Sequence, residues 1–228
     1  MKERTLASLI SLVQTEVFPA ASTDRLFNFY LDRSPDLDLV DGPEIRRRNL
    51  CAYLEVAPER PELLLLAEAP GPRGCRFSGV PFTSEAQIDS GFFPFKGRKS
   101  SVAEAPWSEY SAGIVWGLLR DHFERVVIWN TVPLHPHRKG RPLSIRTPSA
   151  AEIKEWGRLV PQVVAATKPG KVLAIGRVAE RVCDRFGIPA TYVRHPSQGG
   201  ANLFREGVNA FLDRRHPGLD PGSKENSN

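Results

Sequence analysis

The chain has 228 residues, of which 41% are hydrophobic and 25% charged, and this balance excludes a disordered or membrane-embedded protein. No apolar run approaches the roughly 20 residues of a membrane span, and the N-terminus turns polar before a signal-peptide core develops, so we expect a cytoplasmic protein. The net charge of +5 is compatible with a polyanionic partner without requiring one. A chain of this length suits one sizeable core, and we expect a single domain over residues 1–214.

Helical patterns dominate the first 60 residues, where apolar residues recur at helical spacing over 6–13 and an amphipathic stretch covers 44–55. Short apolar runs then alternate with longer helical patterns. The runs lie at 63–67, 126–129, 172–175 and 191–193, and the helical patterns at 110–123, 150–167, 177–186 and 202–212. Residues 215–228 are rich in Gly, Pro and Ser without an apolar period, which predicts a disordered tail.

Continuous apolar strands of this length are typical of a parallel sheet that is covered on both faces. Their alternation with helices predicts an α/β fold with right-handed crossovers. We therefore expect a three-layer α/β/α sandwich around a central four-stranded parallel sheet.

Polar residues follow each predicted strand, where open parallel sheets bind their ligands. The first run ends in Glu68, the second in Asn130, the third in Gly176 and the fourth in the Arg194-His195-Pro196-Ser197 segment. A carboxylate, an amide and an imidazole should therefore meet at one edge of the sheet. Such a set could position a water molecule, read a planar base and stabilise a developing anion.

Four stretches of this sequence resemble motifs of the uracil-DNA glycosylase superfamily, in the order in which that family has them. AEAPGPRGCRFSGVPFTSE resembles its first motif, WNTVPLHP its second-strand Asn segment, IGRVAERV its third-strand turn and HPSQGGAN its His-Pro-Ser motif. The Glu-Ala-Pro-Gly turn is similar to the iron–sulfur branch, whereas the Pro-Gly-Pro and Gly-Val-Pro-Phe spacing is similar to the single-strand-selective monofunctional branch. The three cysteines cannot supply the four ligands of an iron–sulfur cluster, so the expected member has no cofactor.

The resemblance implies a role for each residue of these motifs. Glu68 would orient the attacking water, and His195 would hydrogen-bond uracil O2 and stabilise the departing uracil anion. Asn130 would pair with N3–H and O4, and Phe82 would stack on the flipped base. Ala69 stands among the substrate-binding residues at the position before Pro where other members have Asp or Asn. The structural alternatives are a helix-capping or ion-paired Glu68, a structural His195, an Asn130 that ties two loops, and a core Phe82.

Two basic runs are candidates for DNA contacts. GFFPFKGRKSS interleaves Phe92, Phe93 and Phe95 with cations, the mix expected for base stacking combined with phosphate attraction. HPHRKGR follows Asn130 and adds further cations. Either run could be only a solvated loop. The predicted DNA-binding residues are Lys96, Arg98, Lys99, Arg138, Ser197 and Gln198, with Gln198 or Leu203 as the wedge into the duplex. The pair formed by His135 and His137 lacks further ligands, so no metal is expected.

The predicted function is that of a monomeric, monofunctional DNA-repair glycosylase, which flips uracil from single- or double-stranded DNA and leaves an abasic site. No lysine stands in a motif position, so lyase chemistry through a Schiff base is not expected. Two alternatives stay open: a glycosylase for hypoxanthine, xanthine or mismatched thymine, and a non-catalytic DNA-binding module of the same fold. A flavodoxin-like nucleotide-binding protein is disfavoured, because the first strand-to-helix turn lacks a Gly-rich phosphate cradle.

Overall fold

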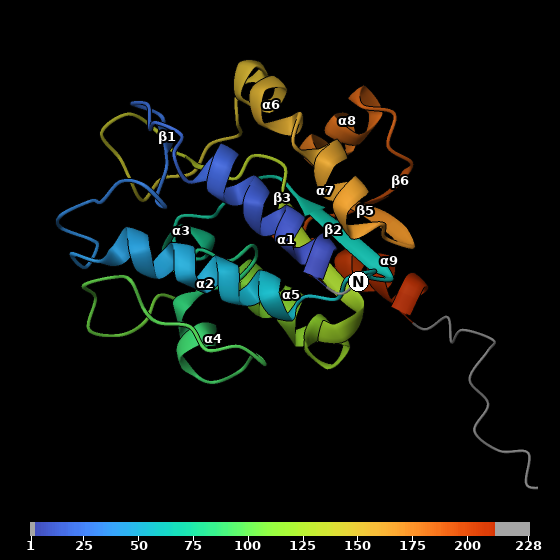
Figure 1. Cartoon of the computed structure of the whole chain (residues 1–228), viewed down its shortest axis with the longest axis horizontal. Helices are drawn as coiled ribbons and strands as arrows, with labels where there is room; N and C mark the ends of the chain where they lie inside the picture. Colours follow the sequence, from blue (N-terminus) through green and yellow to red (C-terminus); the bar gives the residue numbers. More distant parts are fainter. Residues whose placement is uncertain (1–2, 213–228) are drawn as a thin grey trace, which may run out of the picture.

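A parallel four-stranded sheet forms the middle layer of the computed structural model, which describes residues 3–212 (Figure 1). Its strands lie in the order β3-β2-β5-β6, and every neighbouring pair is parallel. They are β2 (Leu63–Ala67), β3 (Val126–Asn130), β5 (Lys171–Ile175) and β6 (Ala190–Val193). All residues of β2 and β3 are buried, as the continuous apolar runs predicted. The predicted tail at 215–228 lies outside the described residues.

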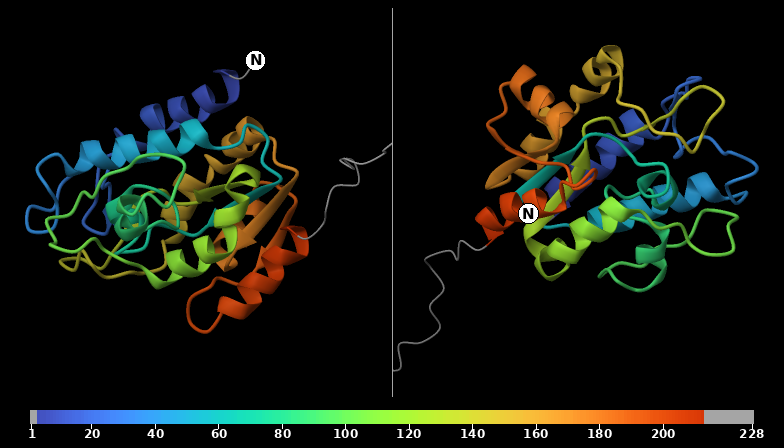
Figure 2. Two further views of the ribbon diagram at one scale, coloured as in Figure 1. Left: turned by 90° about the horizontal axis from the view of Figure 1, so that it is seen from below. Right: turned by 180° about the vertical axis from the view of Figure 1, so that it is seen from behind.

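Helices cover both faces of this sheet, which confirms the predicted three-layer α/β/α fold. One face carries α5 and α9, and α1 and α7 lie on the other (Figure 2). The connection from β2 to β3 leads toward one edge of the sheet, whereas the connections from β3 to β5 and from β5 to β6 lead toward the other edge. Because all these crossovers are right-handed, the helices of the first connection and those of the later two lie on opposite faces. The principal helices are α1 (Glu3–Leu12), α2 (Gly42–Val56), α5 (Tyr110–Leu119), α6 (Ala150–Gly157), α7 (Val160–Thr167), α8 (Arg177–Arg185) and α9 (Ala201–Leu212). No helix among residues 3–212 is long and apolar enough to cross a membrane.

Two predicted helices differ from the structure. The expected continuous helix over 150–167 is wrong: α6 ends at Gly157 and α7 begins at Val160, because Pro161 has no N–H to donate to the carbonyl of Gly157. The helix expected over 110–123 ends at Leu119 and continues as a 3₁₀ segment, η2 (Arg120–Arg125), in which His122 leaves helical geometry.

Several short elements carried no sequence signal that we recognised. A π-helical turn, η1 (Val13–Val17), extends α1, and two short helices, α3 (Cys75–Ser78) and α4 (Glu85–Asp89), follow β2. The strands β1 (Leu26–Phe27) and β4 (His135–Pro136) form a separate antiparallel pair. Elements of two to five residues are too short for a periodic pattern, so tertiary contacts decide them.

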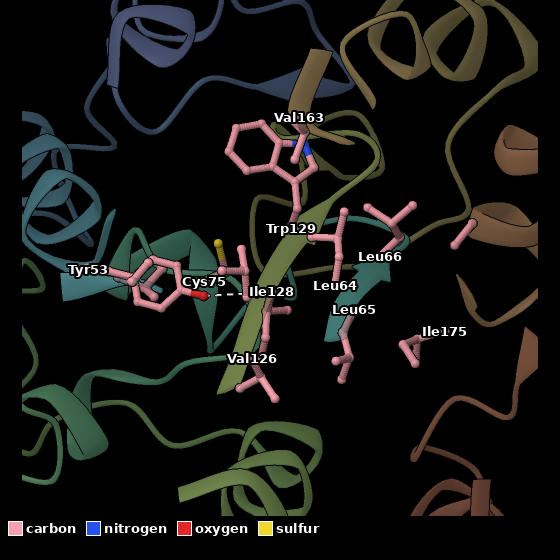
Figure 3. Close-up of a cluster of buried hydrophobic side chains, with 14 of the residues drawn as sticks. Tyr53, Leu64, Leu65, Leu66, Cys75, Val126, Ile128, Trp129, Val163 and Ile175 are labelled. Carbon is pink, nitrogen blue, oxygen red and sulfur yellow. Dashed lines mark hydrogen bonds between the residues drawn. The ribbon is translucent and has the colours of Figure 1, made fainter. Parts of the chain in front are cut away.

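The outer edge of β3 meets α2. The Tyr53 hydroxyl of this helix accepts the backbone N–H of Ile128 at 2.9 Å (Figure 3). Tyr53 is almost fully buried, and burial raises the pKa of its phenol. This contact joins α2 to the sheet beside the strand that ends in Asn130.

A buried ion cluster supports the loop that follows β2. The Asp38 carboxylate contacts Arg76 of α3 at 2.6 Å and Arg46 of α2 at 3.1 Å, and all three side chains are fully buried. Burial opposes ionisation of Asp38, but the hydrogen bond from Arg76 and the charge of Arg46 outweigh it, so its pKa lies below the ordinary value. The cluster thereby fixes α3, and with it Cys75, against α2.

Candidate active site

A cavity of about 700 Å³ opens at the carboxyl ends of the parallel strands. All five residues predicted to act in catalysis or base binding line it, although they come from four separate segments: Glu68, Ala69, Phe82, Asn130 and His195. The convergence follows from the topology, because parallel strands present their carboxyl ends at one edge.

His195 lies beyond the end of β6, with its ring half-buried and 5.5 Å from the ring of Phe82. Burial, followed by the charge of Arg194, lowers the pKa of His195 to about 4, so the imidazole is neutral at physiological pH. The Ser197 N–H donates to Nδ1 at 3.1 Å, and the Ser197 hydroxyl lies 2.8 Å from the same nitrogen. Since Nδ1 accepts, the proton of the neutral ring is on Nε2.

Gly200 makes the tight turn of the His195 loop possible. A Cβ at this position would lie 2.1 Å from the His195 carbonyl oxygen. Gln198 and Gly199 both adopt positive φ angles in the same turn, and Gln198 is exposed at the cavity rim.

Asn130 ends β3 and is 4% exposed. Its Nδ2 lies 3.5 Å from the Cys75 Sγ, a contact that orients the amide with Nδ2 on the Cys75 side. One donor of the amide group and its carbonyl oxygen are therefore available to a ligand in the cavity.

Phe82 adopts a left-handed backbone conformation with a φ of 49°. Such a conformation costs about 1–3 kcal/mol for a non-glycine residue and persists only where neighbouring contacts hold it. Thr83 provides them: its hydroxyl donates to the Pro81 carbonyl at 3.0 Å and accepts Trp116 Nε1 at 3.0 Å, and its carbonyl accepts the Ser78 hydroxyl at 2.7 Å. The ring of Phe82 is thus held at the cavity wall by hydrogen bonds of its neighbours.

Glu68 is half-buried at the end of β2, and burial raises the pKa of its carboxyl, with Arg181 opposing the shift. Within residues 3–212 no hydrogen bond or ion pair holds this carboxylate, so it does not cap a helix or pair with an arginine. The Glu68 carbonyl accepts the Thr131 hydroxyl at 2.8 Å and the Val132 N–H at 3.0 Å, which joins the ends of β2 and β3. The next residue, Ala69, offers only a methyl group to the cavity.

A second carboxylate, Glu109, also lines the cavity and was missed by sequence reasoning. It lies just before α5, where a glutamate has no distinctive spacing to any motif. Burial raises the pKa of the Glu109 carboxyl, although the hydrogen bond from the Ser111 hydroxyl at 3.0 Å opposes the shift. Cys75 was likewise missed as a wall residue, because sequence gives a free cysteine only a packing role.

The basic residues predicted to bind DNA do not line this cavity. Arg98 forms a 3.7 Å pair with Asp41, and the Lys99 ammonium bonds the Ala103 carbonyl. Arg138 is exposed in the loop after β4. Ser197 and Gln198 do line the cavity, while Lys96 is exposed elsewhere.

The expectation that Phe93 and Phe95 stack on bases is wrong. They are 8% and 7% exposed, their rings stack on each other, and Phe93 packs edge-on against Trp116. The two rings therefore belong to the core, whereas Lys96 and Arg98, which follow them in the sequence, are exposed.

Among residues 3–212 no group of three or more His, Cys, Asp or Glu side chains is placed to hold a metal ion, so His135 and His137 lack further ligands there. His135 is fully buried, with Nδ1 2.8 Å from the Pro70 carbonyl and Nε2 3.1 Å from the Pro142 carbonyl. Its ring thereby links the turn after β2 to the loop after β4.

Comparisons with known proteins agree with this geometry. The family profile described as the uracil DNA glycosylase superfamily matches residues 54–214. The chain therefore belongs to the uracil-DNA glycosylase superfamily, a family of DNA-repair hydrolases, and DNA is its substrate. No curated protein sequence matches the chain significantly.

A solved structure supports the same fold. The crystal structure of wild-type Pedobacter heparinus SMUG2 superposes with a TM-score of 0.59 at 13% sequence identity, covering 92% of this chain and 97% of that one. At this identity the likeness shows the shared fold.

Proposed function

We propose that this protein flips uracil out of DNA into the cavity and hydrolyses its N-glycosidic bond, leaving an abasic site. The observation that carries the proposal is the meeting of Asn130, Phe82 and His195 around one cavity, each oriented by a separate contact. We further propose that it acts as a cytoplasmic monomer without a metal or other cofactor.

Asn130 supports uracil as the base. With Nδ2 on the Cys75 side, Oδ1 accepts from uracil N3–H while Nδ2 donates to O4. Cytosine has an acceptor at N3 and a donor at C4, so both contacts would be mismatched. Phe82 stacks on the ring of the flipped base, and its restrained backbone keeps this surface in place before the base arrives.

His195 supports departure of the base as an anion. Breaking the C1′–N1 bond leaves the electron pair on uracil, where O2 carries part of the negative charge. The neutral imidazole donates from Nε2 to O2, because Nδ1 is occupied as an acceptor by Ser197. A donor placed in advance at a developing anion contributes about 3–4 kcal/mol in comparable sites.

Glu68 supports the second half of the reaction. Its carboxylate, free of protein partners among the described residues, stabilises the oxocarbenium-like sugar and orients the water that attacks C1′. Ala69 contributes only a packing surface beside the base. Because its methyl group cannot hydrogen-bond the attacking water, Glu68 must orient that water. Because no lysine in residues 3–212 lines the cavity, we propose hydrolysis without lyase chemistry.

Contacts to the DNA backbone are proposed at two places. Ser197 and Gln198 lie at the cavity rim, where Gln198 can fill the space left by the flipped base. Lys96, Arg98, Lys99 and Arg138 contribute further positive charge farther from the cavity. Binding through phosphates depends on salt, so the contribution of the four cations should weaken as salt rises.

Release of free base from labelled oligonucleotides tests the proposal. Wild-type protein should release uracil from uracil-containing strands in the presence of chelator, and His195→Ala prepared identically is the control for contaminating activity. Release of hypoxanthine, xanthine or mismatched thymine in preference to uracil would contradict the assigned substrate. Binding without release of any base would instead favour a non-catalytic module.

A further inference from the structure

The carboxyl group of Glu109 occupies the space that side chains at positions 71 and 74, in the turn after β2, would fill if these residues were not glycine. A Cβ built on Gly71 would lie 2.1 Å from Glu109 Oε1, and one built on Gly74 would lie 1.8 Å from Oε2. No real Cβ contact is this short, so the carboxyl group is seated against both glycine Cα atoms. The turn needs glycine at both positions because a side chain from another segment, just before α5, fills the place.

The position of Glu109 relative to a bound base follows from Asn130. On the proposed function, Oδ1 of Asn130 faces N3–H and Nδ2 faces O4, and Nδ2 is the atom that contacts Cys75. Cys75 therefore lies on the O4 side of the base. In uracil C5 comes next after O4, whereas O2, assigned to His195, lies on the other side of N3.

Glu109 lies on this same side. It lines the cavity together with Cys75 and Gly71, and its carboxyl contacts Gly74, the residue directly before Cys75. The electrostatic influence of Glu109 reaches the Cys75 thiol, whose pKa is raised first by burial and then by this neighbouring carboxyl. The O4 and C5 edge of the base is therefore bounded by Cys75 and Glu109.

We infer that Glu109 is a specificity-determining residue, whose carboxyl group forms the wall facing C5 of the bound pyrimidine and excludes bases with a methyl group there. Two features make it suited to this role. The wall is rigid, because the carboxyl is seated against Gly71 and Gly74 and accepts the Ser111 hydroxyl. It is also polar, so an apolar methyl group gains nothing by approaching it.

The inference rests on the proposed function for the orientation of the base, but binding tests it without turnover. Oligonucleotides carrying 2′-fluoro-2′-deoxyuridine or its 5-methyl analogue resist hydrolysis, and their dissociation constants give the discrimination at C5 directly. Wild-type protein should bind the uracil form at least ~10-fold more tightly than the 5-methyl form, the scale of discrimination that one carbon atom gives in a tight site. Glu109→Gln, which keeps the shape, should retain this ratio, whereas Glu109→Ala should bring it close to one.

A rescue variant separates a wall from a general loss of structure. In Gly71→Ala/Glu109→Ala the methyl group of residue 71 occupies the space vacated by Glu109, and discrimination should return in part. An unchanged ratio in Glu109→Ala, or a wild-type ratio near one, would overturn the inference. Uracil release by wild-type protein is measured separately. Absence of release would contradict the proposed function, whereas an unaltered ratio of dissociation constants in Glu109→Ala would contradict the role of Glu109.

Discussion

The backbone N–H of Ser197 points at Nδ1 of His195, 3.1 Å away. A backbone donor cannot rotate away or lose its proton, so it dictates the tautomer of the ring more firmly than a hydroxyl could. The Ser197 hydroxyl only reinforces this contact at 2.8 Å. The ability of His195 to donate from Nε2 is therefore built into the main chain.

We expect His195→Ala to slow single-turnover uracil release by about 100- to 1000-fold, as removal of a donor to a developing anion does elsewhere. Glu68→Ala should lower the same rate by a smaller factor, because Ala69 already leaves the orientation of the attacking water incomplete. Ser197→Ala is the matched comparison: with the enzyme saturated by DNA, its single-turnover rate should change little, since the backbone donor to His195 stays. A nearly inactive Glu68→Ala beside a mildly affected His195→Ala would make the carboxylate the indispensable group.

Asn130→Asp should reduce uracil release by at least ~10-fold, because the carboxylate presents only acceptors and O4 would face a negative charge without a donor. Slow release of cytosine is expected at lower pH, where a proton on Asp or on cytosine N3 relieves the remaining mismatch. Single-turnover rates on matched uracil and cytosine oligonucleotides measure both effects. Wild-type uracil activity in this variant would show that Asn130 does not read the base.

The pH dependence of catalysis should have one acidic limb, and it should belong to Glu68. Burial raises the pKa of Glu68, so its ionised form is lost as pH falls through a value above the ordinary glutamate range. Burial lowers the pKa of His195 to about 4, so its ring is already neutral near pH 6.5, the ordinary histidine pKa. His195 should therefore produce no inflection there.

Single-turnover rates between about pH 4 and pH 8, a range that spans the ordinary pKa values of glutamate and histidine, check this expectation. Glu68→Gln should abolish the acidic limb. Glu109→Gln removes the other cavity carboxyl with a raised pKa and should leave the limb in place. An inflection at the ordinary histidine value that survives Glu68→Gln would contradict the assignment.

Asp38→Ala should lower the free energy of unfolding by about 3–5 kcal/mol, because it leaves the buried guanidinium groups of Arg46 and Arg76 without their shared counter-ion. Asp24→Ala removes a carboxylate that pairs with Lys139 at the surface and should change stability little. Urea denaturation of both variants makes the comparison. Similar losses in the two would mean that the buried cluster does not stabilise the loop after β2.

The basic run after Phe95 should contribute to DNA affinity through charge alone. In Arg98→Ala/Lys99→Ala the plot of log affinity against log salt should become less steep, by about 0.7–0.9 for each phosphate that the variant no longer neutralises. Arg158→Ala, which removes an exposed cation paired with Glu16, is the control. An unchanged slope in the double variant would remove this run from the DNA surface, while single-turnover rates at saturation should be unaffected in either case.

The fold and five of the cavity residues could be predicted because they depend on local patterns with a fixed geometric consequence. Continuous apolar runs imply buried parallel strands, and the residues after them must meet at one edge, as Glu68, Asn130 and His195 do. The break at Pro161 could also have been read from sequence, since proline inside a helical pattern removes a hydrogen bond.

Glu109 could not be found in this way. Its place in the cavity depends on how α5 packs over the turn after β2, and nothing near Glu109 in the sequence states that relation. The corresponding signal lies at Gly71 and Gly74, whose missing side chains leave room for it. Reading those glycines as turn formers alone conceals that they accommodate a residue from another segment.

The Tyr53 hydroxyl beside β3 has a consequence for the behaviour of the protein in concentrated solution. An outermost strand offers unpaired backbone groups on which another molecule can build a further strand, and this is a common route to aggregation. By engaging the N–H of Ile128 and placing α2 alongside, Tyr53 closes that site to foreign strands. A single phenol thus helps to keep an apolar strand such as Val126–Asn130 from seeding intermolecular sheets.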